Sequence, residues 1–173
     1  MSVPFYNVSV ANFLQGLNAV AGILEKGKTF CEENDIPLDD MVGYRLIDDM
    51  NPFQFQVISV AHHSMGAMKG LAAGEFAPPN GYGEPDYAGL QALIQESISY
   101  VESVDEATAE SYVGKSMVFK IGGNELPFTC DNFVNTFSLP NFFFHAATTY
   151  DMLRMRGAPL GKMDFLGSMR MGA

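Results

Sequence analysis

The chain has 173 residues, of which 47% are hydrophobic and 17% charged, and its formal net charge is -10. This length fits one domain over residues 1–173 with a single substantial core, and the high apolar content excludes a mainly disordered chain. The negative charge excludes proteins that bind phosphate backbones or anionic membranes, because both favour positive surfaces. We therefore expect neither nucleic acid nor a membrane as a partner.

The cysteines and the first residues indicate a compartment. Cys31 and Cys130 are isolated, without a CxxC pair, which suits reduced thiols. Residues 1–14 lack the basic segment and long apolar core of a secretory signal, and no run approaches the roughly 20 apolar residues of a membrane helix. The sequence therefore predicts a cytoplasmic protein.

The first predicted helix follows an extended lead-in over residues 1–8. It begins at Ser9, a typical N-cap residue, and ends near Cys31. An acidic segment with Pro37 follows and predicts a short helical turn or an irregular crossing. The helix is indicated by apolar residues that recur with helical period, namely Phe13, Leu14, Leu17, Val20, Ala21 and Leu24.

The second predicted helix has Asn51 as its N-cap and Pro52 at its first position, a combination typical of helix starts, and runs to about Ala73. Residues 74–85 are rich in Gly and Pro. Such a long loop in a small bundle is a candidate lid or mobile edge.

Asp86 is the predicted N-cap of a third helix, and residues 117–128 alternate and turn at 122–124, which predicts a β-hairpin. The last helix is expected from Thr129 to Gly157. Four amphipathic helices with a hairpin before the last one predict an all-α fold, a four-helix bundle.

Pro140 falls inside the last predicted helix, where its missing N–H predicts a bend beside the polar residue Asn141. After Gly157, the chain is expected to dock through Phe165–Leu166.

A polar stripe on the predicted helices indicates a site. Asn141, His145 and Thr149 share one face of the last helix, and Gln56 and His63 share one face of the second. Polar groups inside an apolar bundle need partners, water, a ligand or a metal. We interpret them as a cleft that binds a small organic molecule, with His145 as a general base and the two amides orienting a carbonyl or hydroxyl group.

Three segments carry a resemblance to a known family: RLIDDMNPFQFQV, LPNFFFHAATTYDMLR and GAPLGKMDFLG. The order of helices and hairpin resembles the DinB/YfiT-like metalloenzyme superfamily. The three segments resemble, more narrowly, the family called domain of unknown function nineteen-ninety-three. The resemblance covers almost the whole chain and implies up-down-down-up packing of four helices.

The resemblance also implies a metal site, because metal-binding DinB-like proteins use three histidines, one on the second helix and an i, i+4 pair on the last. The corresponding positions here are Gln56, Asn141 and His145. Two carboxamides in place of imidazoles are weak ligands for zinc or nickel. The thiol-transfer and metal-dependent isomerisation activities of the wider group therefore do not carry over.

Several alternatives stay open at the level of sequence. The polar cluster could be a hydrogen-bond network that satisfies itself, and the Phe-rich helices could pair in a non-catalytic homodimer. Arg45 and Asp49 either border the mouth of the cleft or form ordinary surface pairs. Cys130 is either a nucleophile activated at a helix start or a buried structural thiol.

Overall fold

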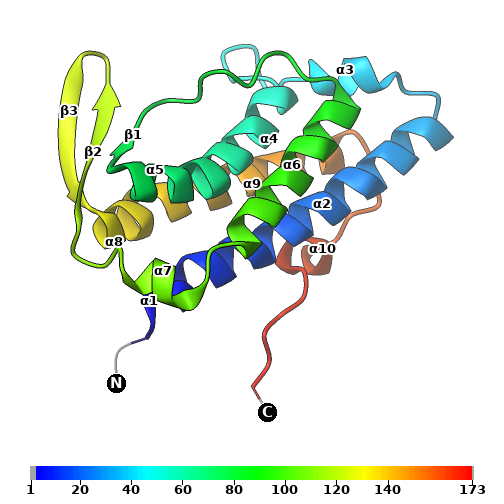
Figure 1. Cartoon of the computed structure of the whole chain (residues 1–173). Coiled ribbons are helices and arrows are strands. Elements are labelled where there is room, and N and C mark those ends of the chain that lie inside the picture. The colour runs from blue at the N-terminus through cyan, green and yellow to red at the C-terminus, as the bar shows by residue number, and fades with distance from the viewer. Residues whose placement is uncertain (1–2, 173) are drawn as a thin grey trace.

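The computed structural model describes residues 3–172 and is mostly helical (Figure 1). Within these residues, four long rods form a bundle. They are α2 (Val10–Glu33); α4 (Phe53–Ala61), which continues through the π-helical turn η1 (His62–Gly66) into α5 (Ala67–Ala73); α6 (Tyr87–Glu102); and α8 (Cys130–Phe133), which continues through a second π-helical turn, η2 (Val134–Ser138), into α9 (Leu139–Met155). Shorter helices are α1 (Phe5–Val8), α3 (Leu38–Val42), α7 (Glu106–Glu110) and α10 (Lys162–Leu166).

The direction of the rods confirms the predicted up-down-down-up bundle. Figure 1 shows α2 and α9 running one way and both α4–α5 and α6 running the other way. Because α5 and α6 are parallel, the chain must return along the whole bundle between them. The Gly/Pro-rich segment 74–86 makes this return, which accounts for its length.

The core lies where α2 and α4 each pack against both α6 and α9. Phe13 and Phe142 meet edge to face, with ring centroids 5.3 Å apart. Gly16 on α2 allows this approach, since a Cβ at this position would lie 2.4 Å from a ring carbon of Phe142.

The predicted hairpin is confirmed and belongs to a small sheet. Strand β2 (Ser116–Ile121) pairs antiparallel with β3 (Asn124–Thr129), and the short β1 (Glu75–Phe76) adds to β2 in parallel. Met117 and Phe119, two residues apart on β2, are both buried, as expected of a strand with one face toward the core.

The prediction of an extended lead-in over residues 1–8 was wrong at residues 5–8, because Phe5–Val8 form α1. Residues 1–2 lie outside the described residues. Ser9 consequently does not cap α2, since its hydroxyl donates back to the carbonyl of Phe5 at 2.6 Å. Asn51 does not cap α4 either. Pro52 is the last extended residue before the helix, one position later than predicted.

The other terminus predictions hold. Asp86 accepts from the N–H of Gly89, and Thr129 accepts from that of Asn132. The bend predicted at Pro140 stays a prediction, but a backbone irregularity does precede this residue, since η2 ends directly before α9. Cys130 is fully buried and burial raises the pKa of its thiol, so the structure favours the structural role over the nucleophile.

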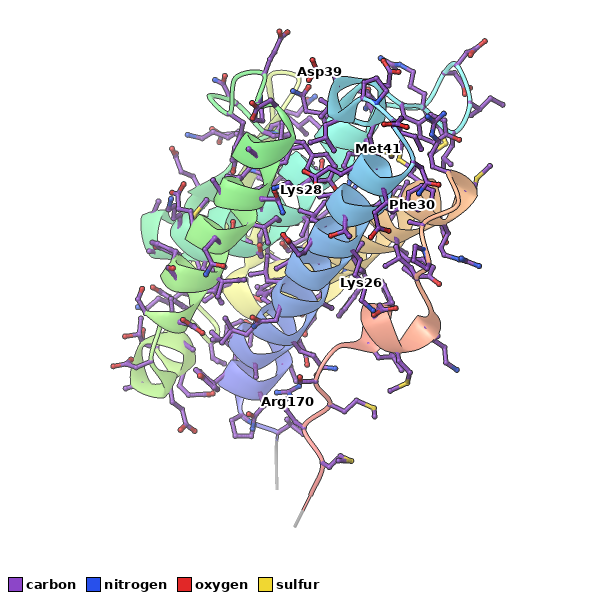
Figure 2. All side chains as sticks on the ribbon, turned by 90° about the vertical axis from the view of Figure 1, so that its right-hand side faces the viewer. Lys26, Lys28, Phe30, Asp39, Met41 and Arg170 are labelled. Atoms are coloured by element: carbon purple, nitrogen blue, oxygen red, sulfur yellow. The ribbon has the colours of Figure 1, made fainter. Side chains whose placement is uncertain are left out.

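The carboxy-terminal segment docks as predicted. Phe165 packs against Tyr150, and the side chain of Gln15 donates to the carbonyl of Leu166 at 2.9 Å. Figure 2 shows Arg170 beside the start of α2. In the range 3–172, no helix combines the length and the apolar character needed to cross a membrane.

Candidate functional site

The centre of the candidate site is a hydrogen bond between α4 and α9. The Nδ1 atom of His145 lies 2.7 Å from Oε1 of Gln56, a residue that is only 2% exposed. The amide nitrogen of Gln56 donates in turn to the carbonyl of Asn51 at 3.0 Å. This second bond fixes the amide with its oxygen toward the imidazole. His145 therefore donates from Nδ1, and its Nε2 carries the lone pair.

His63, in η1, brings a second imidazole to the same place. Its ring is nearly parallel to that of His145, with an interplanar angle of 12° and centroids 6.0 Å apart. Its Nδ1 is sealed from solvent and, within residues 3–172, has no hydrogen-bond partner. The Nε2 atoms of both rings also lack a protein partner in this range, but they are not sealed.

We call Gln56, His63 and His145 the imidazole cluster. Its surroundings are aromatic. Phe55 and Phe144 each meet the ring of His145 at a steep angle, with centroids 5.9 and 5.1 Å away. Around His63 lie the rings of Phe76 and Phe137.

The two π-helical turns are joined at the cluster. The hydroxyl of Ser138, in η2, donates to the carbonyl of His63, in η1, at 2.9 Å. π-Helical turns inside α-helices are frequent at functional sites, and their local widening leaves backbone groups that need other partners. Ser138 supplies such a partner here and ties the helix that carries His63 to the helix that carries His145.

Burial keeps both imidazoles of the cluster neutral. It lowers the pKa of His63 to about 3, with smaller contributions from His62 and His145, and it lowers the pKa of His145 to about 4. Neither ring offers a positive charge at neutral pH. The chemistry open to them is hydrogen bonding and proton acceptance.

Apart from Thr149, which bonds to the backbone of His145, the other predicted site residues form no hydrogen bond or ion pair with the cluster among residues 3–172. Asn141 donates to the carbonyl of Phe137, on its own helix. Thr149 is buried and donates to the backbone carbonyl of His145. Arg45 and Asp49 are exposed, and Arg45 donates to the carbonyl of Met50.

The hydrogen-bond partners of His62 lie in the return segment, residues 74–86. Its Nε2 lies 2.8 Å from the carbonyl of Ala77 and its Nδ1 lies 3.1 Å from the hydroxyl of Tyr82. Sequence reasoning missed this contact. His62 and Tyr82 line a surface hollow of about 300 Å³, and Tyr82 also lines one of about 340 Å³ beside Phe55.

The metal site implied by the resemblance does not fit these residues. In the described part of the chain, no group of three or more His, Cys, Asp or Glu side chains is placed to hold a metal ion. At the implied positions, the Gln56 oxygen already accepts from His145, and the Asn141 amide donates to its own helix. One free imidazole nitrogen on His145 is too small a donor set for zinc or nickel.

Comparisons with known proteins agree with the fold. The structure is similar to the crystal structure of a DinB family member protein from Shewanella denitrificans, with a TM-score of 0.81 and 26% sequence identity, over 97% of this chain and 94% of that one. None of the curated proteins matches the sequence. The profile of the family described as Domain of unknown function (DUF1993) matches residues 5–166, so this chain belongs to that DinB-like family.

Proposed function

We propose that this protein binds a small, uncharged organic molecule at the imidazole cluster between α4 and α9. The observation that carries the proposal is the Gln56–His145 hydrogen bond, which occupies Nδ1 of His145. Its Nε2 is not sealed and has no partner among the residues that the structure describes. Gln56 acts as the positioning residue and His145 as the group that meets the ligand. In many functional sites a hydrogen bond to one ring nitrogen of a histidine fixes the ring and leaves the other nitrogen for the ligand, and Gln56 has this position here.

One sealed nitrogen, Nδ1 of His63, has no partner within residues 3–172 and argues against a network that satisfies all of its members. A structural network closes its hydrogen bonds, because each unpaired buried polar group costs about 1–3 kcal/mol. His62 illustrates such closure, with both ring nitrogens bonded. Among the described residues His63 leaves its sealed Nδ1 unpaired, and the Nε2 atoms of His63 and His145 are open to water or to a ligand.

The shifted pKa limits the chemistry that His145 performs. With a pKa of about 4, it is neutral at pH 7 and ready to accept a hydrogen bond. It is also a weak base, below the strength that suits general base catalysis near neutral pH. Binding is therefore the primary function that we propose. Proton abstraction would be restricted to ligands whose own C–H or O–H is acidic.

The test is a screen of small neutral molecules by NMR on the full chain with labelled histidines. The chain has three histidines, so each imidazole can be assigned. We expect hits that shift the His145 signals, and loss of these hits in His145→Ala with the fold retained. Thr148→Ala is the matched control, because Thr148 is buried on the same helix and donates to the carbonyl of Phe144.

Unchanged binding by His145→Ala would refute the proposal. So would a screen without hits in which His145→Ala loses several kcal/mol of stability, because the imidazole would then be a packing element.

A homodimer is a second candidate, favoured by the exposed aromatic rings of α9. Phe143 is 41% exposed and Phe144 is 58% exposed, although large apolar side chains on one helix are usually buried. Pairing through this surface would bring a second copy beside His145, because Phe144 contacts its ring. Analytical ultracentrifugation of the wild type and of Phe144→Ser tests it, and a monomer at all concentrations would reject it.

A further inference from the structure

The two rings of the imidazole cluster differ in what they offer to a ligand. His145 presents a hydrogen-bond acceptor. Its single proton is on Nδ1, because the oxygen of Gln56 can only accept, and its Nε2 consequently bears a lone pair. The orientation of the Gln56 amide does not rest on this bond alone, since its nitrogen donates to the carbonyl of Asn51.

His63 presents a hydrogen-bond donor. A neutral imidazole has one proton, and on His63 the choice lies between the sealed Nδ1 and the unsealed Nε2. A proton on Nδ1 would be a buried N–H without an acceptor, which is rare in folded proteins. A proton on Nε2 can find water or a ligand. The lower-energy form therefore has its N–H on Nε2.

From this pairing we infer that the site recognises the edge of a cis-amide, as in a lactam or a cyclic imide. The ligand carbonyl would accept from Nε2–H of His63, and the neighbouring ligand N–H would donate to Nε2 of His145. The two rings are nearly parallel and their centroids lie 6.0 Å apart, so a single small ligand can reach both. The inference rests on the proposed function, because it names the class of ligand for that same site.

Charged ligands match this pair poorly. A carboxylate brings two acceptors and no donor, so it would face the lone pair of His145. An ammonium group brings only donors and would face the N–H of His63. No charged side chain forms a hydrogen bond or an ion pair with the three residues of the cluster in the described part of the chain, so nothing there offsets the desolvation of an ion.

The surrounding side chains favour a flat ring as the scaffold of the amide. Phe55 and Phe144 present their rings around His145, and Phe76 and Phe137 do so around His63. Aromatic side chains bind planar unsaturated rings through stacked and edge-to-face contacts. A six-membered unsaturated lactam combines this shape with the required donor and acceptor.

The experiment compares 2-pyridone with N-methyl-2-pyridone on the full wild-type chain. The two probes share the ring and the carbonyl, and only the first has the N–H. Without ligand, ¹⁵N signals of the histidines should show His145 protonated on Nδ1 and His63 protonated on Nε2. With 2-pyridone, the signals of His63 and His145 should shift. The Kd should be at least about tenfold lower than for the N-methyl compound, which corresponds to one hydrogen bond.

Two results would overturn the inference and spare the proposed function. One is a His63 protonated on Nδ1. The other is equal binding of the two probes, or preferred binding of a molecule without an N–H, with shifts at His145 in either case. If neither pyridone nor any molecule of the wider screen shifts His145, both the inference and the proposed function fail.

Discussion

Replacing His63 by Leu tests whether the ring of His63 is as well shielded from solvent as the structure indicates. Burial lowers the pKa of His63 from 6.5 to about 3. A histidine whose folded pKa is lowered makes the protein less stable as the pH falls below 6.5, because the unfolded chain takes up the proton and the folded chain does not. The loss grows until the pH reaches the folded pKa.

The magnitude follows from the two pKa values. Between pH 7 and pH 5 the free energy of unfolding should fall by about 2 kcal/mol through His63 alone. His63→Leu lacks this contribution. It also removes a sealed nitrogen that has no partner in the described part of the chain, so we expect the variant to be at least as stable as the wild type at pH 7. Relative to the wild type, it should gain about 2 kcal/mol when the pH is lowered from 7 to 5.

Urea denaturation followed by circular dichroism at both pH values measures these differences. His62→Leu is the matched control. The two histidines are adjacent and similarly buried, but both nitrogens of His62 are bonded, so this variant should lose about 1–3 kcal/mol at pH 7. An identical pH dependence in the wild type and in His63→Leu would refute the reasoning, because it would mean that the ring titrates in a solvated environment.

Three further outcomes are expected. Gln56→Leu removes the acceptor for Nδ1 of His145, so ¹⁵N signals should show the proton divided between both nitrogens of that ring, at a cost of about 1–2 kcal/mol in unfolding free energy. Gly16→Ala should destabilise by about 1–3 kcal/mol in urea denaturation because its Cβ meets the ring of Phe142, whereas Gly22→Ala, with open space around it, should be neutral or stabilising. Tyr82→Phe removes the donor to His62, and amide hydrogen exchange in residues 77–83 should become faster while α6 stays protected.

The parts of the fold that depend only on residues close together in the sequence were predictable. The hairpin turn at 122–124 and the caps at Asp86 and Thr129 are examples, because backbone conformation and a side chain within a few residues decide them. Ser9 shows the limit. The same hydroxyl that caps a helix can bond back to a preceding carbonyl, and the helical turn before it, α1, decided the outcome.

The candidate site was predictable only in part. The spacing on two helices brought Gln56, His63 and His145 to one place correctly. Asn141 was expected beside them, but its amide donates to the carbonyl four residues earlier, a local bond that competes with any distant partner. The contact between His62 and Tyr82 depends on the path of the return segment, which no local pattern encodes.

The two π-helical turns also control which way the site faces. Each residue of an α-helix advances the chain by about 100° around the axis, so the five-residue turn Val134–Ser138 sets the angular phase of everything after it. Deleting a single residue there would swing α9 by about a quarter of a revolution relative to the hairpin that precedes it. His145 would then leave the sector that faces α4. The geometry of the site is thus encoded in the count of residues in a turn as much as in their identity.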